Sequence, residues 1–147
     1  TTGLLGDWNA AAELFENTNR TLGNFPMILM GLGYSYARLN KQDETMRIIS
    51  RLEKMKQEQP DANLEFMLAF LYVTINNLEK FYEYYDICIS RKSFWAIELY
   101  ASRPMKPIWY DPHVIDSRKK LGLPVLKCAS ALQTENDKSV MQLEKAN

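Results

Sequence analysis

The chain has 147 residues, of which 46% are hydrophobic and 24% charged, as in an ordinary soluble globular protein that buries one sizeable core. Eighteen lysines and arginines balance eighteen aspartates and glutamates, so no net charge attracts the chain to nucleic acid or to an anionic membrane surface. We therefore expect a single cytoplasmic domain, residues 1–147, that binds neither.

Histidine and cysteine are too scarce to suggest a metal site or a cofactor. Cys88 and Cys128 form no Cys-x-x-Cys pair, and His113 alone cannot complete a usual zinc quartet. We interpret both thiols as reduced and structural. The sequence also lacks a run of about 18 apolar residues, the length that a helix needs to span a bilayer. No metal, cofactor or transmembrane helix is expected.

The first predicted helix covers roughly residues 8–20. It begins after Asp7, a residue type that caps helix N-termini. Apolar side chains follow at helical spacing, at Trp8, Ala11, Ala12 and Phe15. Residues 23–26 end this helix and place a proline in the first turn of the next one.

Two helical hairpins are predicted next. Each pairs two helices across a short turn, at residues 27–39 with 42–57 and at residues 62–75 with 78–90. The helix at 62–75 is apolar nearly all round, so we expect neighbours to cover more than one of its faces. Gly31 and Gly33 lie inside a helix, where they are expected to allow close helix packing and not to form a phosphate-binding loop.

Shorter elements are predicted toward the C-terminus. A short helix at residues 94–101 and a loop at 103–107 precede a helix that Asp111 caps and Pro112 begins. That helix is expected to stop at residues 121–124. Beyond it, apolar residues on either side of a polar stretch predict two further helical segments, at Leu126, Ala129 and Leu132 and at Val140, Met141 and Leu143.

The two hairpins are diverged copies of one unit. Their first helices share a large-small-aromatic pattern that ends in asparagine, with each position 36 residues from its mate, so that Leu68, Ala69, Tyr72 and Asn76 match Leu32, Gly33, Tyr36 and Asn40. A third, partial copy lies at the start of the chain, in Gly6, Asp7, Trp8, Ala11 and Phe15. A fixed period in this range indicates stacked helical hairpins.

At these residues the chain resembles the tetratricopeptide repeat (TPR) family, whose unit is an antiparallel helix pair of about 34 residues. The resemblance implies an all-α fold, a TPR-like right-handed superhelix of antiparallel helix hairpins with C-terminal capping helices. It places the three repeats and the capping segment at residues 4–23, 26–59, 62–92 and 93–147. Thr45 and Phe81 depart from the family pattern, which usually has alanine at their position.

The segment after the last repeat also carries a resemblance. Its Arg/Pro-containing loop, the Asp-Pro pair and the Lys-Lys-Leu-Gly-Leu-Pro stretch are similar to the closing segment that follows the C-terminal TPR region of bacterial transcriptional regulators and nucleotide cyclases. The chain begins without a methionine, in the second half of a hairpin. We therefore expect a fragment of a larger regulatory protein.

The predicted function is non-catalytic binding of a peptide or partner helix. In the TPR family the first helix of each hairpin lines a concave groove, and here that face combines methionines, aromatic rings and an arginine, which suit a peptide. The predicted groove residues are Met27, Met30, Tyr34, Arg38, Asn63, Phe66, Phe70 and Thr74. This composition disfavours the lysine and asparagine clamp with which some members bind chaperones. The chain's own tail is the alternative occupant.

Three other functions are open alternatives. The helix at residues 8–20 lacks most of its hairpin partner, so Trp8 and Phe15 are candidates for homodimer formation or for contact with an upstream domain. An enzyme would have to use His113 with one of the two cysteines. Nucleic-acid binding would use small basic clusters and aromatic rings, at residues 91–92 and 118–120 and at Trp95, Trp109 and Tyr110.

Overall fold

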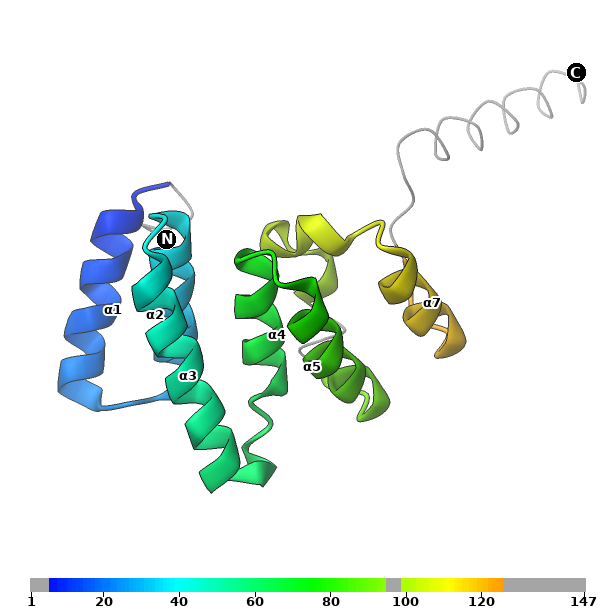
Figure 1. Ribbon diagram of the computed structural model, residues 1–147, viewed down its shortest axis with the longest axis horizontal. Coiled ribbons are helices and arrows are strands. Elements are labelled where there is room, and N and C mark those ends of the chain that lie inside the picture. The colour runs from blue at the N-terminus through cyan, green and yellow to red at the C-terminus, as the bar shows by residue number, and fades with distance from the viewer. Residues whose placement is uncertain (1–5, 95–98, 126–147) are drawn as a thin grey trace, which may run out of the picture. The chain divides into compact units, whose positions relative to one another are not determined.

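The computed structural model describes residues 6–94 and 99–125, and these ranges contain helices and no strand (Figure 1). The α-helices are α1 (Trp8–Leu22), α2 (Pro26–Arg38), α3 (Gln42–Glu58), α4 (Glu65–Thr74), α5 (Leu78–Ser90) and α7 (Pro112–Lys120). Short 3-10 helices are η2 (Pro60–Ala62), η3 (Leu99–Ala101) and η4 (Arg103–Ile108). The chain divides into two compact units, Thr1–Met105 and Lys106–Asn147, and each is described by itself.

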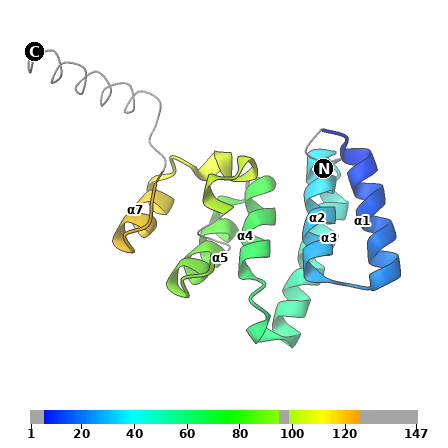
Figure 2. The ribbon, with the colours of Figure 1, turned by 180° about the vertical axis from the view of Figure 1, so that it is seen from behind.

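In the first unit, successive helices pack as antiparallel pairs (Figures 1 and 2). Helix α2 contacts both α1 and α3, and α4 contacts α5. Contacts of α4 with α2 and α3 join the two hairpins. The expected all-α fold of antiparallel helix pairs is therefore confirmed.

Local sequence signals fix where most helices begin. The Asp7 carboxylate accepts a hydrogen bond from the backbone N–H of Ala10 at 3.0 Å, as predicted for the cap of α1. The Asp111 carboxylate likewise accepts from the N–H groups of His113 and Val114, at 2.9 and 3.2 Å. Both caps satisfy N–H groups that have no partner inside the helix.

The 36-residue sequence repeat is also a repeat of backbone conformation. Asn40 and Asn76, which end α2 and α4, both have left-handed backbones, with φ of 58° and 60°. In each turn the residue after the asparagine donates a 2.9 Å hydrogen bond to the carbonyl of the repeated tyrosine, Tyr36 or Tyr72. Asparagine tolerates this conformation better than most residues, which explains its recurrence at both turns.

Helix α4 is the most enclosed element of the first unit. Every residue from Glu65 to Val73 is buried, because α2, α3 and α5 all pack against this helix. The prediction that several of its faces are covered is confirmed.

The packing role of the two glycines in α2 is also confirmed. A Cβ atom at Gly31 would lie 2.5 Å from the Phe15 ring of α1. A Cβ at Gly33 would lie 3.0 Å from Ile48 of α3 and 3.1 Å from Leu71 of α4. Both positions thus let a neighbouring helix approach more closely than a larger residue would allow.

The structure differs from the sequence predictions at three places. Helix α4 begins at Glu65 and not at residue 62, because Pro60–Ala62 forms a 3-10 turn and Asn63 has a left-handed backbone. The predicted loop at 103–107 is part of the 3-10 helix η4. Of the helix predicted at 94–101, residues 95–98 lie outside the described residues and Leu99–Ala101 is a 3-10 turn.

In the second unit, α7 begins and ends as predicted. Its Arg118 side chain is buried, and Nε donates a 2.7 Å hydrogen bond to the carbonyl of Pro124 beyond the helix end. The apolar segments predicted from Leu126 onward lie outside the described residues. The capping role of residues 93–147 stays a prediction. No helix in the described parts of the chain is both long and apolar enough to cross a membrane.

Candidate functional site

Aromatic side chains from three helices meet at one end of the predicted groove. The Tyr34 ring contacts Trp8 and Phe70 edge-to-face, with centroid distances of 5.1 and 5.2 Å. The Arg38 guanidinium lies 5.3 Å from the centroid of the Trp8 ring. Because Trp8 comes from α1, this end of the groove is occupied by the chain's own side chains.

Two further groove residues offer little contact surface. Met30 and Thr74 are half-buried, and the Thr74 hydroxyl donates a 2.6 Å hydrogen bond to the carbonyl of Leu71. Phe70 is buried, with 8% of its surface exposed. Met30, Phe70 and Thr74 do not belong to the lining of the pocket at the other end of the stripe.

The other end of the stripe opens into a pocket of about 470 Å³. The pocket lies where α4 begins and α5 ends, with Met27 of α2 in its wall. Three predicted groove residues, Met27, Asn63 and Phe66, line it. Met67 and Phe94 add apolar surface that the sequence analysis did not assign to a site.

Polar side chains also line the pocket. Within the described residues, neither the Asn63 amide nor the Ser93 hydroxyl has a hydrogen bond to another protein group. Both belong to turns, since Asn63 has a left-handed backbone and the Ser93 N–H donates to the Cys88 carbonyl at the end of α5. These groups are therefore available to a ligand in the pocket.

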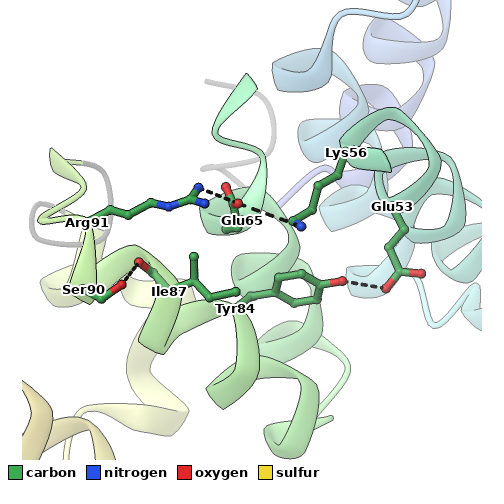
Figure 3. Close-up of polar contacts among 7 residues, drawn as sticks. All are labelled: Glu53, Lys56, Glu65, Tyr84, Ile87, Ser90 and Arg91. Carbon is green, nitrogen blue, oxygen red and sulfur yellow. Dashed lines mark hydrogen bonds and ion pairs between the residues drawn. The ribbon is translucent and has the colours of Figure 1, made fainter. Parts of the chain in front are cut away.

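A charged cluster spans the pocket wall (Figure 3). Arg91 Nη1 lies 2.7 Å from Glu65 Oε1, and Lys56 Nζ lies 4.0 Å from the same oxygen. Glu65 is in the first turn of α4, where the helix dipole favours a negative charge. Its side chain is only 4% exposed, whereas that of Arg91 is 53% exposed. Two cations thus compensate one buried carboxylate.

Cys88 lines the same pocket but is not set up as a nucleophile. Burial, and secondarily the negative charge of Glu65, raises the pKa of its thiol to about 12. The thiol is therefore protonated at neutral pH, whereas nucleophilic attack requires the thiolate. His113 belongs to the second unit and Cys128 lies outside the described residues, so the pairing that the enzyme alternative requires stays untested.

A second set of polar contacts, hydrogen bonds from tyrosine to glutamate, recurs between successive hairpins and joins their helices. The Tyr72 hydroxyl donates to Glu53 Oε1 at 2.6 Å. Tyr84 donates to the same oxygen at 3.2 Å, as Figure 3 shows. One repeat earlier, the Tyr36 hydroxyl donates to Glu16 at 2.5 Å. Burial raises the pKa of each of these three phenols, most strongly at Tyr72 and Tyr84. Each bond ties a hairpin to the helix before it.

The two residues predicted for self-association pack inside the first unit. Trp8 contacts Tyr34, and Phe15 lies over Gly31, so both rings are half-buried against α2. The large exposed apolar side chains of α1 are Leu14 and Leu22. Self-association through Trp8 and Phe15 stays a prediction.

The basic clusters have fewer open charges than their sequences suggest. Arg118 is buried, whereas Arg91 pairs with Glu65 but keeps a side chain that is 53% exposed. Lys120 pairs with Asp116 at 2.8 Å. Trp95 lies outside the described residues. This arrangement lends little support to a nucleic-acid site.

No metal site is formed within the described ranges, since no three His, Cys, Asp or Glu side chains there are placed to hold an ion.

The pocket at the start of α4 and the end of α5 is the best candidate site, with apolar walls, open polar groups and a charged rim. Comparison with protein-family models, with curated proteins and with solved structures finds no significant match for this chain.

Proposed function

We propose that the chain is a non-catalytic protein-interaction module of the TPR type, and that its pocket binds a segment of a partner peptide. The 36-residue repeat of turns, together with the repeated tyrosine–glutamate bonds, supports a stacked-hairpin array in which parallel first helices line one face. Within the predicted groove, the proposed binding site is the end of that face where Met27, Asn63 and Phe66 lie.

The observation that carries this proposal is the composition of the pocket. Apolar walls from Met27, Phe66 and Met67 suit a large side chain, while Asn63 and Ser93 offer unpaired hydrogen-bonding groups to a peptide backbone. A volume of about 470 Å³ falls within the usual range for ligand sites. The same wall holds a protonated thiol and a paired carboxylate, which favour binding over nucleophilic chemistry.

Peptide display with a matched pair of variants tests the proposal. The 147-residue chain is screened against a random peptide library, and an enriched peptide is titrated by isothermal calorimetry. Met27→Lys changes an exposed pocket methionine, and Met46→Lys changes one of similar exposure on α3, 47% against 43%, outside the pocket. We expect Met27→Lys to weaken binding about tenfold or more, as for a contact residue, and Met46→Lys to leave it unchanged.

Two outcomes would count against the proposal. One is a library screen that enriches no peptide. The other is an enriched peptide whose affinity is equally insensitive to both methionine variants. Phe94→Ala provides a second check, because Phe94 lines the pocket and is 63% exposed, so its truncation should weaken binding without unfolding the chain.

A further inference from the structure

The exposed charge at the pocket is positive. The lining contains one cation and one anion, Arg91 and Glu65, and Lys56 reaches Glu65 from outside the lining. Glu65 is buried, but half of the Arg91 side chain is exposed at the pocket. The guanidinium has five N–H donors in a planar fork, and the Glu65 contact shown in Figure 3 uses one of them. Arg91 can therefore bind a second acceptor while it keeps Glu65.

We propose that the pocket recognises a peptide segment in which a large apolar residue stands next to an aspartate or glutamate. The apolar side chain enters between Met27, Phe66 and Met67, and the acidic side chain binds Arg91. This inference rests on the proposed peptide-binding function and specifies its ligand. An anionic group is favoured because the exposed charge at the pocket is the Arg91 guanidinium, and because charge-assisted bonds to guanidinium are the stronger kind.

The position of Arg91 favours an acidic side chain within the segment. Cys88 belongs to the deep part of the wall, with 4% of its surface exposed, whereas the Arg91 side chain is 53% exposed. A carboxylate that reaches Arg91 thus lies near solvent, while the adjacent apolar side chain goes deeper. Neighbouring side chains of an extended peptide point in alternate directions and so meet both requirements. The peptide backbone then continues past the pocket on either side.

Capped peptide pools that differ by one functional group test the acidic preference. The probes are hexapeptides with acetylated N-termini and amidated C-termini, in which a fixed Leu-Glu pair or a fixed Leu-Gln pair is flanked by two mixed positions on each side. Binding to the isotope-labelled 147-residue chain is followed by NMR shifts of the backbone amides of residues 63–67 and 88–94. We expect the Leu-Glu pool to bind about tenfold more tightly, with a preference that shrinks in high salt.

Variants of the charged cluster assign this preference to Arg91. The double variant Arg91→Gln with Glu65→Gln removes both members of the ion pair. No buried carboxylate then remains without its cation, so the fold is retained and the acidic preference should disappear. Glu65→Gln alone removes the internal competitor for Arg91 and should strengthen binding of the Leu-Glu pool several-fold. Circular dichroism confirms that each variant is folded. A merely structural role for Arg91 would leave the Glu-to-Gln ratio unchanged.

The outcomes separate this inference from the function on which it rests. If both pools shift the pocket amides with equal affinity, the acidic preference is refuted and the peptide site stands. If neither pool shifts those amides, both proposals fail. A third pool with Leu-Gln and a free C-terminal carboxylate tests the other source of an anion, and tighter binding of that pool than of the Leu-Glu pool would overturn the assignment to an acidic side chain.

Discussion

The close approach of α1 to α2 makes Gly31→Ala an informative perturbation. Alanine in a helix interior is favoured over glycine by about 1 kcal/mol, so the substitution stabilises the helix itself. The new Cβ atom, however, would lie 2.5, 2.6 and 2.9 Å from three atoms of the Phe15 ring, well inside the optimum of about 3.5–4.0 Å for carbon atoms. The whole end of the ring must therefore move away from α2.

The two effects oppose each other, and their magnitudes decide the sign. Overpacking of this kind costs about 1–3 kcal/mol, because a side chain leaves its rotamer or its contacts. With a central value of about 2 kcal/mol and the helix gain of about 1 kcal/mol, Gly31→Ala should lower the free energy of unfolding by about 1 kcal/mol. Urea denaturation followed by far-ultraviolet circular dichroism measures this difference.

A double-mutant cycle isolates the contact. In a Phe15→Ala background the clash is absent, so Gly31→Ala should now stabilise the chain by about 1 kcal/mol, which gives a coupling of about 2 kcal/mol between the two positions. The reversal of sign is the expected signature. Equal effects of Gly31→Ala in the two backgrounds would refute the reasoning, since they would mean that the Phe15 ring does not lie over Gly31.

Two further predictions concern the tyrosine–glutamate bonds. Tyr72→Phe removes a 2.6 Å hydrogen bond to Glu53 and should lower the free energy of unfolding by about 1–2 kcal/mol in urea titrations. The control Tyr110→Phe, at a half-exposed ring, should leave the free energy of unfolding unchanged. Equal effects of the two substitutions would argue against the bond. Burial, then the bond to Glu16, raises the pKa of Tyr36 from 10.0 to about 12, so the folded state holds this proton more tightly than the unfolded chain. The stability that this phenol contributes is complete below about pH 10 and is lost as the pH rises toward 12. In a plot of the urea midpoint against pH, Tyr36→Phe should therefore reduce the fall between about pH 10 and 12. An unaltered plot would contradict the assignment.

The helices themselves were predictable because their signals are local. A cap such as Asp7 or Asp111 acts on N–H groups within three residues, and a left-handed asparagine acts on the turn that contains it. Apolar periodicity likewise identified α4 as an enclosed helix before its neighbours were known. The exception is the start of α4, where Ala62, predicted to be helical, belongs to a 3-10 turn and Asn63 has a left-handed backbone.

The open surface of the groove was only partly predictable, because it depends on contacts between distant residues. Periodicity placed Tyr34 and Phe70 on one face, but it carried no information that Trp8 of α1 would reach Tyr34 and occupy that end. In the same way, Arg91 looked like half of a small basic cluster, and its pairing with Glu65 follows from the meeting of two helix ends.

The amino-acid sequence by itself therefore determined the helices, their caps and the repeated hairpin, because each depends on side chains within a turn or two of one another. Only the tertiary structure decided which part of the repeated face stays open. The packing of α1, α2 and α4 filled one end with aromatic rings, while the start of α4 and the end of α5 left a pocket with an exposed arginine at the other. That outcome depends on shape and charge compensation across the core, which no spacing along the chain records.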